Sequence, residues 1–212
     1  MITIKAFEFN YFSENCYLLH DETNEAVLID CGACRKEEED ELSTYVAQNG
    51  LTIKRLLCTH LHLDHVFGND FVFKTYGLRP EVHKSEIEKL PSPAEQSQLF
   101  GIKTPIEAVQ AARYIVGNEV IKFGKSELIA LLVPGHSPGS LAFYNAKEKF
   151  VISGDALFSG SIGRTDLWGG NQEVLVAAIK DKLLSLPDET VVYPGHGPTT
   201  SIIEEKYNNP FL

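Results

Sequence analysis

The chain has 212 residues, 43% of them apolar and 23% charged, proportions typical of a globular protein with one domain or two small ones. Its 29 acidic and 19 basic residues give a formal net charge of −10 without any run rich in lysine or arginine, which argues against partners such as nucleic acid or an anionic membrane surface. The first fifteen residues lack the apolar core of a secretory signal, and no apolar run approaches the roughly 20 residues of a membrane helix, so we expect a cytoplasmic protein.

The first part of the chain is predicted to form strands. The segment ITIKAFEF is apolar at Ile2, Ile4 and Ala6, an alternation typical of a strand with one buried face. Two further strand-like segments, CYLLH and AVLID, follow on either side of the turn-forming sequence DETNE.

A helix is expected at residues 36–49. Acidic residues occupy its first turn, where the helix dipole favours them. Leu42, Tyr45 and Val46 fall on one face, and Asn49-Gly50 is typical of a C-terminal stop. A buried strand at 53–59 then leads directly into the sequence THLHLDH.

Residues 84–115 have a different character. Ser92 followed by Pro93 predicts a short helix with a serine N-cap and proline at its first position. The stretch from Pro105 to Tyr114 predicts a second helix. We therefore expect a helical insertion between two halves that are rich in strands.

The second half again predicts strands, each of them short and apolar. They lie at 127–133, 141–145, 149–153 and 190–194. Residues 173–186 predict the clearest helix of the chain. Its apolar stripe consists of Val174, Leu175, Ala178, Ile179 and Leu183. Strands with interspersed helices and no strict alternation predict sheets covered by helices, in a layered α/β or α+β fold.

Five of the seven histidines, together with Asp64 and Asp155, lie just beyond the ends of apolar strands. These histidines are His60, His62, His65, His136 and His196. Imidazole nitrogen and carboxylate oxygen suit Zn²⁺, Fe²⁺ or Mn²⁺. Seven ligands shared between two ions leave coordination positions open for water, as a catalytic site requires. The other two histidines, His20 and His83, are interpreted as ordinary polar residues.

The motifs THLHLDH, PGHSPGS, ISGD and PGHGP resemble, in this order, the metal motifs of the metallo-β-lactamase superfamily. The resemblance covers essentially the whole chain and implies an αββα sandwich, an α+β fold of two mixed sheets flanked by helices. It implies one domain over residues 1–212, with the insertion at about 84–115. The implied ligands are His60, His62 and His136 for the first ion, Asp64, His65 and His196 for the second, and Asp155 as a bridge. Asp30 in LIDCG matches an aspartate that supports the site from behind, since metal ligands need partners that fix their orientation.

Within the superfamily, His65 combined with Asp155 is most similar to glyoxalase II, the hydroxyacylglutathione hydrolases, and differs from the best-known β-lactamases. The segment GSIGRTD at 160–166 is similar to a loop of compact proteins of this type, in which a basic residue at the position of Arg164 contacts substrate. Full-length glyoxalase II has a C-terminal helical domain that supplies much of the glutathione pocket, whereas sixteen residues follow His196 here. Residues of the insertion are therefore candidates for substrate contacts instead, namely Phe100, Arg113 and Tyr114.

The expected activity is hydrolysis of a thioester such as S-lactoylglutathione by water activated between two divalent ions, zinc first and iron or manganese as alternatives. Asp64 and Asp155 are the catalytic candidates. One alternative is a persulfide dioxygenase, a class that shares the fold and a GRTD-like segment and uses one iron. Another uses Cys31 and Cys34, whose CxxC spacing between a strand and a helix resembles a redox-active dithiol. No thioredoxin-like pattern surrounds this pair.

Overall fold

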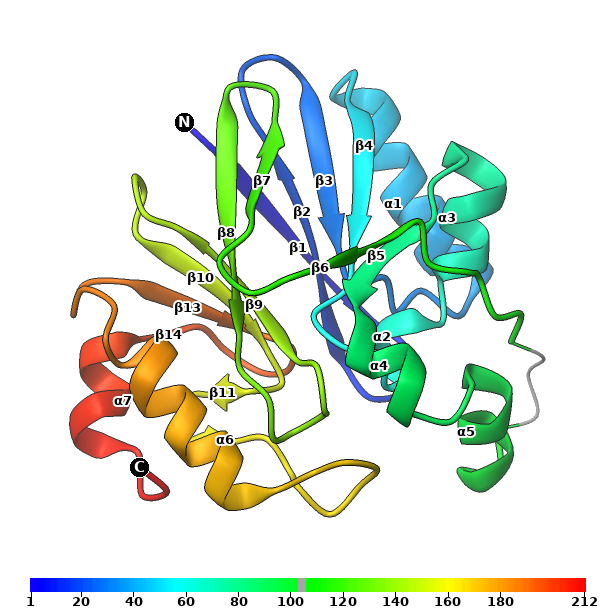
Figure 1. Ribbon diagram of the computed structural model, residues 1–212. Helices are drawn as coiled ribbons and strands as arrows, with labels where there is room; N and C mark the ends of the chain where they lie inside the picture. Colours follow the sequence, from blue (N-terminus) through cyan, green and yellow to red (C-terminus); the bar gives the residue numbers. More distant parts are fainter. Residues whose placement is uncertain (103–105) are drawn as a thin grey trace. The chain divides into compact units, whose positions relative to one another are not determined.

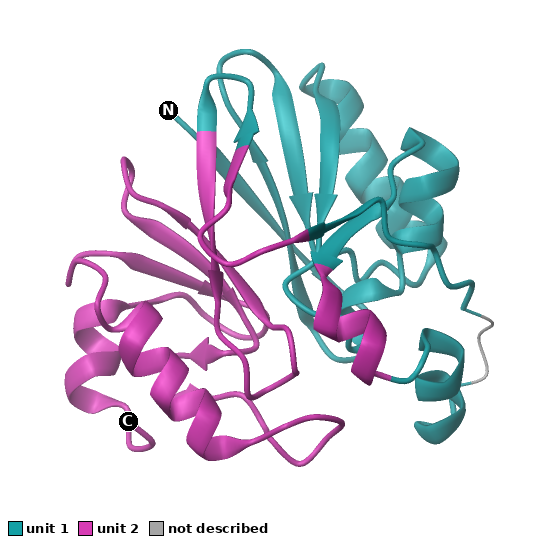
Figure 2. Ribbon diagram, in the orientation of Figure 1, with its two compact units in different colours: residues 1–82, 91–114, 122–126 teal, residues 83–90, 115–121, 127–212 magenta. Residues whose placement is uncertain are grey.

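The structure is a computed structural model that describes residues 1–102 and 106–212. It divides into two compact units (Figure 2). Unit 1 consists of Met1–Val82, Pro91–Tyr114 and Lys122–Ser126, and unit 2 of His83–Leu90, Ile115–Ile121 and Glu127–Leu212. The assignment of residues 1–212 to one domain stays a prediction. None of the helices in the described residues has the length and apolar character needed to cross a bilayer.

Unit 1 is built around a six-stranded mixed sheet whose strands follow one another in chain order (Figure 1). They are β1 (Thr3–Phe9), β2 (Glu14–His20), β3 (Glu25–Ile29), β4 (Thr52–Leu57), β5 (Pro80–His83) and β6 (Arg113–Ile115). The first three strands pair antiparallel, whereas β3, β4 and β5 run parallel. Parallel neighbours end at the same edge of a sheet, so the residues that follow β3 and β4 come close together there.

Three helices of unit 1 supply the crossovers between its parallel strands. They are α1 (Lys36–Gln48), α2 (Leu63–Val66) and α3 (Asn69–Tyr76). Leu42 and Val46 of α1 are buried in one cluster with Phe7 and Phe9 of β1. The prediction that Ala6 faces the core is wrong, because the larger aromatic side chains of β1 take the face against α1 and leave Ala6 exposed.

Unit 2 contains most of the second six-stranded mixed sheet (Figure 1). Its spatial order is β14 (Thr200–Ser201), β13 (Val191–Pro194), β10 (Phe150–Gly154), β9 (Leu141–Asn145), β8 (Ser126–Leu132) and β7 (Val120–Phe123). Strand β9 pairs antiparallel with both β8 and β10, and β10 pairs parallel with β13. Strands β8, β10 and β13 therefore run in one direction, and the residues that follow them gather at one edge of the sheet. A short hairpin, β11 (Leu157–Phe158) and β12 (Ser161–Ile162), follows β10.

Three helical segments cover a face of this second sheet: α6 (Gln172–Ala178), the π-helical turn η1 (Ile179–Leu183) and α7 (Ile202–Asn208). Leu175, Ile179 and Leu183 are buried, as predicted. The prediction is wrong for Val174, which is 44% exposed. The helix turns Leu175 inward instead. Leu175 packs so closely on Gly135 that a side chain at position 135 would overlap Leu175. The helical segment also ends at Leu183, before the predicted residue 186.

The insertion contains α4 (Lys84–Lys89) and α5 (Pro93–Leu99). The predicted capping of α5 is confirmed, since the Ser92 hydroxyl accepts a hydrogen bond from the backbone N–H of Glu95 at 3.3 Å. The second predicted helix is wrong for residues 106–114, which form no helix, and its first residue, Pro105, lies outside the described residues. Residues 113–115 form β6 instead, because pairing at the edge of a sheet outweighs local helix propensity.

Candidate metal-binding clusters

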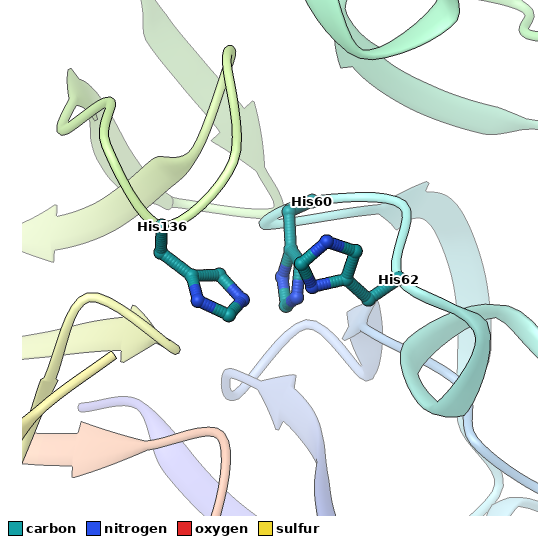
Figure 3. Close-up of side chains that lie close together, drawn as sticks. All are labelled: His60, His62 and His136. Carbon is teal, nitrogen blue, oxygen red and sulfur yellow. The ribbon is translucent and has the colours of Figure 1, made fainter. Parts of the chain in front are cut away.

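The first cluster of candidate ligands lies in unit 1, where β4 leads into α2. His60, His62 and His65 are buried, with at most 6% of their surface exposed. The rings of His60 and His62 offer nitrogens within 4.8 Å of each other, and Figure 3 shows both rings on the loop that follows β4. Asp64 and His65 belong to α2, and Oδ2 of Asp64 lies 3.8 Å from Nε2 of His65. We call these four residues the N-terminal cluster.

Asp30 and Thr59 determine which nitrogens of this cluster carry protons. The backbone N–H and the hydroxyl of Thr59 donate to the Asp30 carboxylate, at 2.7 and 2.6 Å. Since the hydroxyl gives its single proton to Asp30, its oxygen accepts from Nδ1 of His60 at 3.0 Å. Nδ1 of His65 donates to the same carboxylate at 3.0 Å. The neutral rings of His60 and His65 therefore hold their proton on Nδ1 and leave Nε2 able to bind a cation.

The backbone of Asp30 is strained. Its φ is 50°, in the left-handed region, although aspartate tolerates this region better than most residues. The residue is 2% exposed, and its N–H donates to the carbonyl of Leu57 at 2.9 Å. Strain of this kind persists only where the surroundings determine the conformation, and it is concentrated at functional sites. The conformation holds the carboxylate at the carboxyl ends of β3 and β4.

Two residues that the sequence analysis did not identify complete this cluster. Asn10 donates from its side chain to the carbonyls of Gly32 and Asp64, both at 2.9 Å, and so holds the backbone of a candidate ligand. Glu14 is fully buried 4.0 Å from Nδ1 of His65, and among the described residues its carboxylate oxygens find no hydrogen-bond partner. Burial raises the pKa of Glu14 well above its ordinary value, against the lowering effect of His65. No signal near these residues in the sequence points to such roles.

The second cluster lies in unit 2 at the edge where β8, β10 and β13 end. It consists of His136, Asp155 and His196, and we call it the C-terminal cluster. Oδ2 of Asp155 lies 3.7 Å from Nε2 of His136 and 3.5 Å from Nε2 of His196. Figure 3 shows the His136 ring on the loop after β8. One carboxylate oxygen thus lies near two imidazole nitrogens, as a shared ligand requires.

The loop at 160–166 fixes the ring of His136. Nδ1 of His136 donates to the backbone carbonyl of Arg164 at 2.8 Å, so its Nε2 is the nitrogen left unprotonated in the neutral ring. Gly163 allows this approach, because a Cβ there would lie 2.9 Å from the same nitrogen. The side chain of Arg164 is 57% exposed, and its guanidinium pairs with both oxygens of Asp166, at 2.7 and 2.8 Å. The expected contact between Arg164 and substrate stays a prediction.

The remaining histidines and the CxxC cysteines lie outside both clusters. Nδ1 of His83 accepts from the N–H of Ser85 at 3.3 Å at the start of α4, and His20 lies against the ring of Tyr45. Burial, with the charge of Glu38, raises the pKa of Cys34 to about 11. A redox-active dithiol needs a lowered pKa, so the environment of Cys34 opposes that alternative.

Residues 10–196 match the family described as the Metallo-beta-lactamase superfamily. The chain is 38% identical over 200 residues to the probable metallo-hydrolase YqgX of Bacillus subtilis (strain 168), covering 93% of this chain and 92% of the relative. It is 37% identical over 206 residues to the hydroxyacylglutathione hydrolase GloC of Haemophilus influenzae, covering 95% of this chain and 93% of the relative.

Solved structures resemble the chain over nearly its whole length. The crystal structure of the BLEG-1 B3 metallo-beta-lactamase has a TM-score of 0.89 and 37% identity, with 99% of both chains covered. The crystal structure of TTHA1623 in a di-iron-bound form has a TM-score of 0.86 and 34% identity, covering 98% of this chain and 100% of the other. ETHE1 from Myxococcus xanthus has a TM-score of 0.79 and 29% identity, covering 98% of this chain and 83% of the other. These similarities confirm the predicted fold class of two mixed sheets flanked by helices.

Proposed function

The chain belongs to the metallo-beta-lactamase superfamily, and from this membership we propose that it is a metal-dependent hydrolase acting on thioesters of the S-lactoylglutathione class. Two relatives support this proposal by name, one as a probable metallo-hydrolase and the other as a hydroxyacylglutathione hydrolase. The substrate is then a small molecule, and the acidic balance of the chain favours neither nucleic acid nor an anionic membrane as a partner.

One observation carries the proposal: each of His60, His65 and His136 donates its Nδ1 proton to an oxygen and keeps Nε2 for a cation. Carboxylates accompany these rings in both clusters. Imidazole and carboxylate donors fit zinc first, and also iron or manganese. We assign two divalent ions to the ligands that the superfamily motifs imply. These are His60, His62 and His136 for one ion, Asp64, His65 and His196 for the other, and Asp155 for both.

When bound, such ions lower the pKa of a coordinated water from about 16 towards neutrality and polarise the thioester carbonyl. The protein's own groups then orient the reaction. In the proposed reaction the carboxylates of Asp64 and Asp155 orient the attacking oxygen. Addition of that oxygen to the carbonyl carbon and loss of the C–S bond leave a carboxylate and a thiol. Asp30 and Thr59 keep two of the imidazoles in one orientation throughout.

We assign the anionic part of the substrate to Arg164. Its guanidinium donates two hydrogen bonds, one to each carboxylate oxygen of Asp166, and is therefore oriented for a partner with two oxygens. A carboxylate of the substrate would replace Asp166 in this arrangement. Phe100 and Tyr114 present half-exposed rings and remain candidates for substrate contacts. Arg113 is less available, because its guanidinium pairs with Glu81 at 2.7 Å.

A persulfide dioxygenase is the second candidate function. The similarity to ETHE1 favours it to some degree, and the di-iron-bound form of TTHA1623 adds iron as a metal to consider. The 37% sequence identity to a B3 metallo-beta-lactamase makes β-lactam hydrolysis a third activity to measure.

The experiment measures three reactions on one metal-analysed preparation: hydrolysis of S-lactoylglutathione, oxygen consumption with glutathione persulfide, and β-lactam cleavage. Thioester hydrolysis above the other two supports the proposal, whereas oxygen consumption without thioester cleavage replaces it with the dioxygenase. Asp155→Ala should abolish turnover. Asp188→Ala is the matched control and should keep wild-type rates, because the one side-chain contact of this aspartate among the described residues is a surface ion pair with Lys206 at 3.1 Å. Near wild-type turnover by Asp155→Ala contradicts the mechanism.

A further inference from the structure

Helix α4 of the insertion carries its side chains in an unexpected orientation. Glu86 is 1% exposed, whereas the neighbouring Ile87 is 47% exposed. Glutamate is seldom fully buried unless it is paired, and an amphipathic surface helix normally turns the isoleucine inward. A buried carboxylate on a six-residue helix therefore needs partners that outweigh its loss of hydration.

The partners of Glu86 lie in the loop that contains His136. Oε1 of Glu86 accepts from the hydroxyl of Ser137 at 2.8 Å and from the backbone N–H of Gly139 at 2.5 Å. The Ser137 hydroxyl also meets that of Ser140 at 2.6 Å, and the carbonyl of Ser140 accepts from the N–H of Val133 at 2.8 Å. One carboxylate oxygen is thus the centre of the hydrogen bonds that close loop 133–140.

The packing of α4 against this loop is equally close. A Cβ on Gly139 would lie 2.6 Å from Nδ1 of His83, the residue at the start of α4, and 3.1 Å from Oε1 of Glu86. Only glycine allows the loop backbone to come so near. Glu86 therefore meets its partners across a tight, buried contact, where a charge-assisted hydrogen bond is stronger than at a surface.

We propose that Glu86 is a positioning residue for His136. It orders loop 133–140 and so presents the ring that the carbonyl of Arg164 fixes from the other side. The contacts of Glu86 restrain the backbone of the loop, whereas the carbonyl of Arg164 restrains the imidazole ring of His136. Both restraints are needed to place Nε2 of His136 within the tolerance that a metal ligand requires. The role towards a metal rests on the proposed function, whereas the ordering of the loop does not.

The test compares Glu86→Ala and Glu86→Gln with Asn145→Ala. Glutamine retains an oxygen at the position of Oε1 and should restore what alanine loses. Asn145 is the matched control, since it is buried and holds a turn at the far end of β9, donating to the carbonyl of Glu127 at 2.8 Å. Zn²⁺ affinity, measured by competition with a chelator, should fall about 10- to 100-fold in Glu86→Ala and stay near wild type in the other two. Equal losses in Glu86→Ala and Asn145→Ala, or no rescue by glutamine, overturn the proposal.

A second readout uses the metal-free protein. Amide hydrogen exchange in loop 133–140 should become at least about tenfold faster in Glu86→Ala than in wild type or Glu86→Gln, because the N–H of Gly139 loses its acceptor. Unchanged exchange overturns the ordering role even if zinc binding differs. A wild-type protein that binds zinc but cleaves no thioester refutes the proposed substrate and leaves the comparison of zinc affinities intact. A wild-type protein that binds none of zinc, iron and manganese overturns both the proposed function and the role of Glu86 towards a metal.

Discussion

Removing the carboxylate of Asp30 should destabilise the protein strongly and weaken its metal binding as well. Asp30→Ala deletes the acceptor of three hydrogen bonds, two from Thr59 and one from His65, in a site that is 2% exposed. A hydrogen bond to a charged group contributes about 1.5–3 kcal/mol, and the three are not additive because they share one carboxylate. Alanine also tolerates the left-handed backbone less well than aspartate, by about 1 kcal/mol.

We therefore expect the free energy of unfolding to fall by about 4–5 kcal/mol, a large part of the 5–15 kcal/mol typical of a folded domain. The assay is urea unfolding of the metal-free protein in the presence of a chelator. Asp30→Asn separates the two effects. It keeps an acceptor for the N–H of Thr59 and tolerates the backbone conformation, but it places an amide where two donors need an oxygen.

Asp30→Asn should thus lose less stability than Asp30→Ala, yet lower zinc affinity about 10- to 100-fold, because His60 and His65 are no longer held with the proton on Nδ1. A loss below about 1 kcal/mol in Asp30→Ala would refute the account of the hydrogen bonds. Wild-type zinc affinity in Asp30→Asn would refute the role of Asp30 in selecting the protonated nitrogen.

Three further predictions concern other parts of the chain. Burial raises the pKa of Asp21, but four hydrogen bonds to its carboxylate outweigh burial and hold that pKa well below its usual range. Asp21→Asn should therefore lower the free energy of unfolding at pH 7, and the loss should become smaller as the pH falls below about 4. Urea unfolding at several pH values measures this. Gly32→Ala should prevent the protein from folding, because the added Cβ would overlap Asn10, Glu14 and the backbone of Asp64. A wild-type melting temperature in this variant would contradict the packing. Cys34, with a pKa raised to about 11 from an ordinary value of 9.0, should react with iodoacetamide at neutral pH about 100-fold more slowly than a free thiol, because its thiolate is that much rarer. Labelling at the rate of a free thiol would restore the redox alternative.

Much of the fold was predictable because its signals are local. Helix α1 begins and ends within a residue of the predicted bounds, since its acidic first turn and Asn49-Gly50 stop act through the neighbouring backbone. The predictions failed where tertiary packing decides. Phe7 and Phe9 faced inward in place of Ala6, and β6 replaced a helix, because the partner surface outweighs periodicity in a short segment.

For the candidate sites, the sequence by itself determined the chemical identity of the donors and their place after apolar strands, because H-x-H-x-D-H and Pro-Gly-His are read over a few residues. Only the tertiary structure decided how those donors are held. The carboxylate that orients His65 is 35 residues away along the chain, the carbonyl that fixes His136 is 28 away, and Glu86 is 51 away from Ser137. Parallel strand pairing and a buried helix face bring these partners together, and neither is encoded by spacing in the sequence.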